Sequence, residues 1–294
     1  MNEAGTRKKG YAAFFLSGIC AISSGVVVSL LQESFGLSFL AGYLPGIIGA
    51  RATVLILTLG YVLGYGTVAL SQTAMLLMVA FFMVGLAKGT ALNRCTVMAG
   101  MNSPDRSKSL QILHSCYALG ALLCPFLIAG LNTVHPRMPM IGLAGIGLIM
   151  WMIFCFAHLP GKEKTADKKR KKSDLSFLRS ADFWLLTAMV FCQNAAETSV
   201  TGWMVTYYRN MNVLSGIFSA YTMTVMWAAT LITRLLLAFV IPVKNRPKAL
   251  CLMGIACTGL YLLMIPLMNP VPAILVLFLF SAAMAGVNPM STAM

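Results

Sequence analysis

The chain has 294 residues, of which 59% are hydrophobic and only 10% charged, and its mean hydropathy is +0.81. A soluble globular domain carries about 25% charged residues, so the composition excludes that class and indicates an integral membrane protein. The net charge of +14 would suit a nucleic-acid-binding protein, but the basic residues gather in the connections between apolar segments, which argues against that function.

We predict an all-α membrane protein of about nine or ten helices. The apolar segments are rich in leucine, methionine and glycine and do not alternate with period two, which favours helices over the strands of a barrel. Most of them reach the ~20 residues that a spanning helix requires. In chain order they lie near 11–32, 52–71, 74–99, 109–131, 139–158, 182–208, 213–243, 247–267 and 271–294.

The basic residues alternate between connections, and this pattern predicts the topology. They cluster in the N-terminal tail, at Arg51, at 106–108, in the stretch 161–179 and at 244–248, and the connections between these are nearly free of them. The positive-inside rule then predicts a multi-pass protein of the cell membrane with its N-terminus and the 159–180 loop in the cytoplasm.

No pattern in the sequence supports catalysis. The eight cysteines form no C-x-x-C pair, the three histidines are scattered, and no zinc-protease, phosphate-loop or dinucleotide-binding motif occurs in a suitable context. We therefore expect no enzyme, no metal and no cofactor.

A weak internal repeat relates two parts of the chain. "LAGYLPGIIGARATVL" (40–55) aligns with "LAFVIPVKNRPKALCL" (237–252), and "SSGVV" around Gly25 aligns with "VTGWM" around Gly202 at a shorter offset. The difference in offset predicts that about 20 residues, most of one helix, are missing from the first part. The segment 38–50 that remains is too short to span a ~30 Å bilayer core unaided.

Two further motifs carry a resemblance to a known family. "HSCYALGALLCPFLIAG" (114–130) places a histidine before glycines and a proline, and "ETSVTGWMVTYY" (197–208) places an acid before a tryptophan and tyrosines. With the repeat, these resemble the fifth and seventh helices of the major facilitator superfamily, in particular of its fucose-permease or sugar-permease-like branch.

The resemblance implies a bundle of two pseudo-repeated halves, here incomplete. Residues 1–158 would form the N-terminal half, with helices one to six and a helix two shortened to 38–50. Residues 159–180 would form the basic cytoplasmic loop, and 181–294 a partial C-terminal half with helices seven to ten. We expect a truncated member that lacks most of helix two, the end of helix ten, and helices eleven and twelve.

Charged residues inside the apolar segments are the candidates for function. Only Lys88, Arg94, Glu197 and Arg234 lie well within such segments, and each costs about 2.5–3.5 kcal/mol near a helix centre, so such residues usually face a partner or a cavity. The sequence interpretation of Arg234 is a gating or packing residue.

Helical spacing places polar residues beside the single acid. Gln193, Glu197 and Thr201 recur at i, i+4 and i+8. The resemblance implies that helices one, four, seven and ten line a central cavity, where a Lys88–Glu197 pair would join the halves and Glu197 could exchange a proton. The predicted solute- and proton-binding residues are Glu197, Lys88, Gln193, Asn194, Thr201, Trp203, Tyr207, Asn93, Asn288 and Arg94.

Structural roles without a part in transport stay open as alternatives for several of these residues. Glu197 could be satisfied by neighbouring polar groups without a transport role, Arg94 could extend to the cytoplasmic surface, and Trp203 and Tyr207 could be interfacial aromatics. His114 with Gln111 is more typical of a helix–helix hydrogen bond than of a proton relay.

The function that the resemblance implies is secondary active transport by alternating access. We expect a monomer in the lipid bilayer that couples the symport of a small polar, sugar-like solute to protons or sodium. An exporter of an organic anion or drug is the alternative within the class, because Lys88 and Arg94 outnumber the single acid. A non-transporting membrane fragment or scaffold is the alternative of another class.

Overall fold

A computed structural model describes residues 3–22, 48–100, 103–157, 180–214, 216–241, 243 and 245–291. Within these ranges every regular element is a helix, which confirms the predicted all-α class. The N-terminal part contains α1 (Glu3–Ile22), α4 (Ala50–Leu70), α5 (Ala74–Gly100), α6 (Arg106–Asn132) and α7 (Met138–Phe156). The predicted short helix 38–50 and all but Ser180 of the 159–180 loop lie outside or at the edge of the described residues.

The C-terminal part contains α8 (Ala181–Asn210), α9 (Gly216–Phe239), α10 (Arg246–Met264), α11 (Pro270–Ala285) and the short α12 (Val287–Ser291). The segment predicted as one helix over 271–294 is divided at Gly286, the C-cap of α11. Asn245 caps the start of α10 by accepting a hydrogen bond from the Lys248 amide at 3.2 Å, as Asp105 does for α6 with the Lys108 amide at 3.0 Å.

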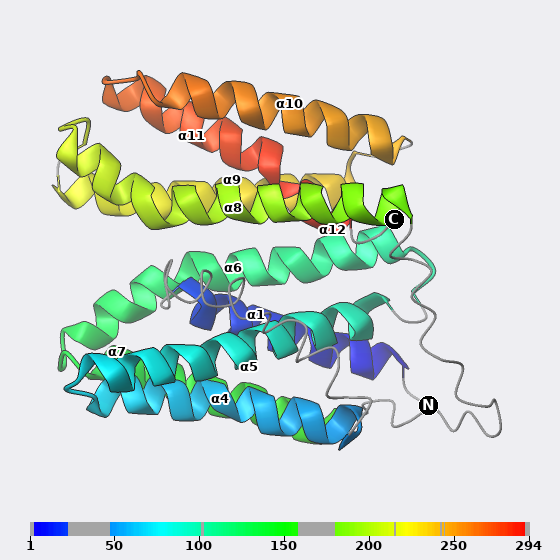
Figure 1. Ribbon diagram of the computed structural model, residues 1–294, viewed down its shortest axis with the longest axis vertical. Helices are drawn as coiled ribbons and strands as arrows, with labels where there is room; N and C mark the ends of the chain where they lie inside the picture. Colours follow the sequence, from blue (N-terminus) through cyan, green and yellow to red (C-terminus); the bar gives the residue numbers. More distant parts are fainter. Residues whose placement is uncertain are drawn as a thin grey trace.

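The helices form two groups that meet along α6 and α9. Figure 1 shows α1, α4, α5, α6 and α7 in its lower part and α8 to α12 in its upper part. The principal contact between the groups joins α6 to α9, and α12 also touches α6.

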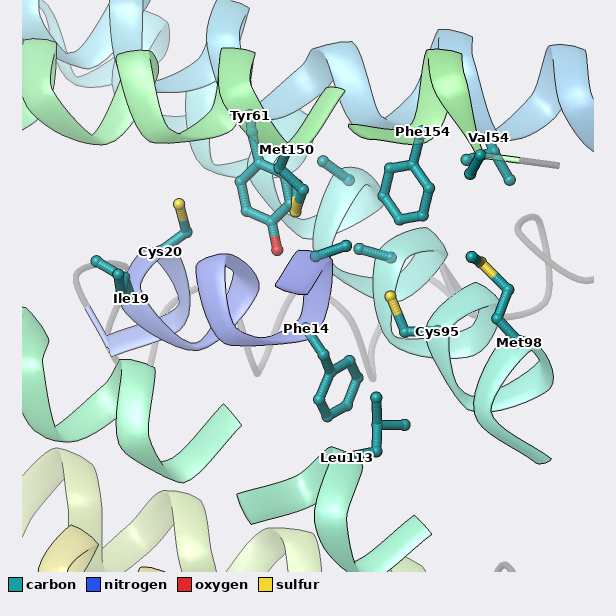
Figure 2. Packing of buried hydrophobic residues seen from close by; sticks show 14 of the residues in the cluster. Phe14, Ile19, Cys20, Val54, Tyr61, Cys95, Met98, Leu113, Met150 and Phe154 are labelled. Carbon is teal, nitrogen blue, oxygen red and sulfur yellow. The ribbon is translucent and has the colours of Figure 1, made fainter. Parts of the chain in front are cut away.

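The core of the N-terminal group is built from closely approaching helices. Figure 2 shows Phe14 and Cys20 of α1 among side chains of the neighbouring helices, including Tyr61 and Phe154. A Cβ atom at Gly120 of α6 would overlap the carbonyl oxygen of Phe15, so a residue without a side chain is required where α1 and α6 touch.

Basic side chains of the described helices mark one end of the bundle, which we call the basic end. Lys9 at the start of α1 donates to the Phe156 carbonyl oxygen at 2.6 Å, and Arg51 at the start of α4 donates to that of Cys155 at 3.2 Å. Lys108, at the start of α6, lies 4.9 Å from the centre of the Phe239 ring at the end of α9. α1, α4 and α6 therefore all begin at the basic end.

Among the described residues, seven helical spans have the length and apolar composition needed to cross a membrane. The chain is thus a multi-pass membrane protein. α8 is not in that set although it has 30 residues, because a run of polar residues around Glu197 lowers its hydropathy.

Candidate functional site

Glu197 lies in the middle of α8, where it is partly buried and hydrogen-bonded within its own helix. The Gln193 side-chain amide donates to the Glu197 carboxylate at 2.9 Å, as their i, i+4 spacing predicts. The Thr201 hydroxyl instead donates to the backbone carbonyl oxygen of Glu197 at 2.8 Å. Only Gln193 of the predicted stripe therefore touches the carboxylate, and the carbonyl oxygen of its own side-chain amide is buried without a hydrogen-bond partner.

Two cations from other helices lie in the electrostatic field of Glu197. Lys88, in the middle of α5, and Arg234, in α9, both interact with its charge. Lys88 belongs to the N-terminal group and Glu197 to the C-terminal group, and the predicted Lys88–Glu197 pair across the halves stays a prediction. In the described part of the chain the two charged groups do not approach within the 4.0 Å of a salt bridge.

Arg234 is the most completely buried of the charged residues that the structure describes, with 3% of its surface exposed. Its Nη1 donates to the backbone carbonyl oxygen of His114 in α6 at 2.9 Å, and its Nε donates to that of Ala285 in α11 at 3.0 Å. One guanidinium thus joins α9 to its neighbour in the same half and to α6 in the other half. The charge-assisted hydrogen bonds compensate part of its desolvation.

Aromatic rings continue this contact along α6. Tyr117 packs against Trp227 of α9 with ring centres 5.9 Å apart, and against Phe14 of α1 at 5.3 Å. The charges of Glu197 and Arg234 also act on the Tyr117 hydroxyl. Tyr117 therefore lies where α1, α6 and α9 come together.

Several buried polar atoms near this junction have no hydrogen-bond partner within the described residues. They are Gln111 Oε1 and His114 Nε2 on α6, and Trp227 Nε1 on α9. The sequence marks Gln111 only as a hydrogen-bonding residue with His114, and nothing in it singles out Tyr117 or Trp227, because each is an ordinary residue of a membrane helix. Their positions depend on how α6 and α9 face each other.

The remaining predicted residues are dispersed around this centre. Arg94 is partly buried, and two of its guanidinium nitrogens have no hydrogen-bond partner among the described residues. Asn194 is partly buried on α8. Asn93 is exposed, and Trp203 has 63% of its surface exposed. The Tyr207 hydroxyl donates to the Ile265 carbonyl oxygen at 2.6 Å, at the end opposite the basic end.

Asn288 lies in α12, where its backbone carbonyl accepts a hydrogen bond from the Ser291 hydroxyl at 2.9 Å. The described residues contain no group of three or more His, Cys, Asp or Glu side chains that could hold a metal ion.

We call Lys88, Gln193, Glu197 and Arg234, with Tyr117 beside them, the central site. It contains one carboxylate and two cations on which its charge acts.

Comparisons with known proteins agree with this architecture. The sequence model described as Major Facilitator Superfamily matches residues 21–294. No curated protein matches the chain significantly.

Solved structures share the fold at low sequence identity. FucP, a transporter of the same superfamily, in the outward conformation is 17% identical, with a TM-score of 0.70 over 98% of this chain and 83% of that one. A point variant of FucP, the Escherichia coli fucose:proton symporter, is 16% identical, with a TM-score of 0.72 and the same coverage. The human organic anion transporter MFSD10 (TETRAN) is 16% identical, with a TM-score of 0.73 over 100% of this chain and 85% of that one.

Proposed function

Because the chain belongs to the Major Facilitator Superfamily, we propose that it moves a small polar solute across the cell membrane together with a proton. Members of this family are transporters and are generally not enzymes. The solute would bind between the two halves, whose relative rocking exposes it to each side in turn. The N-terminal half would be 1–158 and the C-terminal half 181–294, joined by the 159–180 loop.

The observation that carries the proposal is the placement of Glu197. Its carboxylate lies in the middle of α8, and its charge acts on Lys88 of the opposite half and on Arg234. Adding a proton to Glu197 would weaken both attractions at once. Protonation would therefore alter the forces between the halves, which is what coupling of a proton to alternating access requires.

The α6–α9 contact supplies an axis about which the halves could rock. Arg234 and the Tyr117–Trp227 pair hold α9 against α6 in the middle, and Lys108 over Phe239 holds them at the basic end. An interface that remains joined during rocking needs such side-chain contacts near its centre.

The orientation in the membrane follows from the basic end. Lys9, Arg51 and Lys108 gather there, together with the start of the C-terminal half's α10 at Arg246. Under the positive-inside rule the basic end, the N-terminus and the 159–180 loop face the cytoplasm.

The solute-binding residues would surround Glu197. Gln193, Asn194, Thr201 and Lys88 would supply polar contacts, with Asn93, Arg94, Asn288, Trp203 and Tyr207 further along the path. Similarity in fold to a fucose:proton symporter supports a hydroxylated solute, and amide groups such as those of Gln193 and Asn194 suit the hydrogen bonding of hydroxyl groups.

Reconstituted vesicles would test the proposal. The full chain in proteoliposomes should accumulate labelled solute when the outside is more acidic, and a protonophore should abolish the accumulation. L-fucose is the first probe, followed by D-galacturonate and D-gluconate. Uptake that only equilibrates, with or without a protonophore, would contradict proton coupling. A chain that inserts normally but moves no probe would favour the scaffold alternative.

A further inference from the structure

We propose that the solute is an anion, and that Lys88 binds its acidic group at the centre of the bundle. This inference rests on the proposed function, since it names the chemical class that the central site would carry. In this proposal Lys88 sets the substrate specificity. Its ammonium interacts either with the acidic group of the solute or with the Glu197 carboxylate.

The first observation is an excess of positive charge. Lys88, Arg94 and Arg234 lie within described membrane helices, and Glu197 is the only described carboxylate away from a helix end. The other described carboxylates lie at helix starts, at Glu3, Asp105 and Asp182. A buried cation without a counter-charge is costly, so a negatively charged solute would be stabilised here.

The second observation is that Lys88 and Arg234 differ in their hydrogen-bond partners within the protein. The Arg234 guanidinium donates to the carbonyl oxygens of His114 and Ala285. Among the described residues, no hydrogen bond or ion pair reaches the Lys88 ammonium, although the charge of Glu197 acts on it. Lys88 is therefore the cation at the central site whose three donors have no partner in the described part of the chain, and we assign them to the solute.

Arg94 is a weaker candidate for the same role. Two of its guanidinium nitrogens are buried without partners, but it lies nearer the basic end of α5, and Glu197 is not among the groups that act on its charge. A solute bound at Arg94 would not feel the proton on Glu197. Lys88 combines available donors with coupling to the carboxylate.

These contacts suggest how proton and anion would travel together. With Glu197 ionised, its negative charge balances Lys88 from across the halves. When Glu197 takes up a proton, Lys88 loses that balance, while Arg234 keeps its two carbonyl partners and Tyr117 remains beside the site. One monoanion then restores the charge balance, so one proton and one monoanion enter with no net charge moved.

Buried groups in the same helices favour an anion that also bears hydroxyl groups. Gln111 Oε1 and Gln193 Oε1 are buried acceptors and Trp227 Nε1 is a buried donor, each lacking a partner within the described residues. Leaving a buried polar group without a hydrogen-bond partner destabilises the protein. Solute hydroxyl groups could pair with them, which points to a hydroxylated carboxylate such as a sugar acid.

Binding to matched acid and neutral probes tests the inference. Calorimetric titration of the detergent-purified full chain would compare D-galacturonate with D-galactose, D-gluconate with sorbitol, and lactate with 1,2-propanediol. At least one acid should bind about tenfold or more tightly than its neutral partner, as a charge-assisted contact predicts. Equal binding within every pair, or binding by no acid, would overturn the proposal.

Substitution of the lysine identifies the contact. Lys88→Gln should remove the preference for the acid and raise its Kd about tenfold or more, whereas Lys88→Arg should keep the preference because the charge remains. Lys248→Gln, an exposed lysine at the start of α10, is the matched control and should bind as the unmodified chain does. Monodisperse elution and an unchanged unfolding midpoint would show that each variant folds.

Electrical recording on proteoliposomes separates this inference from the proposed function. Uptake of the bound acid under a proton gradient should acidify the lumen without a membrane current. A current in the direction of proton flow would overturn the anion proposal and leave proton coupling intact. Uptake with neither acidification nor dependence on the gradient would overturn the proposed function itself.

Discussion

The two helices that the internal repeat pairs, α1 and α8, differ sharply at one matched position. Cys20 of α1 is fully buried, and its thiol lies 3.9 Å from the Leu143 carbonyl oxygen. Glu197, which aligns with Cys20, is partly buried and accepts a hydrogen bond from Gln193. The same position therefore packs the core in one half and carries a charge in the other. Related halves can share a scaffold while only one of them holds the ionisable group.

The surroundings of the two helices differ in the same way. α1 packs closely on α6, and the Tyr61 hydroxyl lies 3.0 Å from the Ser17 hydroxyl in a core that leaves little room. α8 packs on α9 and α12, and many of its side chains, including Trp184 and Trp203, are exposed. The N-terminal half is therefore closely packed around α1, whereas the C-terminal half contains a polar helix, α8, with many exposed side chains.

Transfer of the acid to the matched position should have the largest effect on stability. Cys20→Glu would place a carboxylate in an apolar core, and the free energy of unfolding should fall by about 3 kcal/mol or more. Met268→Glu, at an exposed position in the turn between α10 and α11, is the control and should change it little. Unfolding by denaturing detergent, followed by circular dichroism, would measure both. Equal stability of the two variants would show that the halves tolerate a charge alike.

Removal of the guanidinium that joins the halves should have the next largest effect. Arg234→Met would eliminate two charge-assisted hydrogen bonds, and the free energy of unfolding should fall by about 2–3 kcal/mol. Arg209→Met, at the exposed end of α8, provides the control. The same unfolding assay applies. An Arg234→Met variant as stable as the control would show that α6 and α9 do not depend on this contact.

The close approach of α1 and α6 can be tested at a single glycine. Gly120→Ala would force α6 away from the Phe15 backbone, and we expect a loss of about 1–2 kcal/mol. Gly130→Ala on the same helix meets no atom within 4 Å and should be neutral or slightly stabilising. If both variants behave alike, the N-terminal half is less tightly packed than the comparison with α8 implies.

The smallest effect is expected on the exposed side of α8. Trp203→Phe should change the free energy of unfolding by less than about 0.5 kcal/mol, because the ring has 63% of its surface exposed. Uptake of the solute by the same variant then reports whether the ring serves transport. A large loss of stability would show that Trp203 packs as firmly as the residues of α1.

The role of Glu197 in transport stays a prediction, but the sequence did predict the helices, since length, apolar composition and i, i+4 spacing act locally along the chain. It predicted the Gln193–Glu197 contact for the same reason. It did not predict that Arg234 binds the carbonyls of His114 and Ala285, or that Trp227 meets Tyr117. Those contacts depend on how each helix is rotated and on its depth beside a partner distant in the sequence, and neither is encoded in local spacing.

The measurement that tests the central claim most directly compares accumulation with exchange in Glu197→Gln proteoliposomes. The glutamine retains shape and hydrogen bonding but cannot release a proton. We predict that the variant loses accumulation driven by a proton gradient while it still exchanges labelled for unlabelled solute at equal pH, as a permanently neutral side chain should. If Glu197→Gln accumulates the solute as the unmodified chain does, Glu197 is not the coupling group.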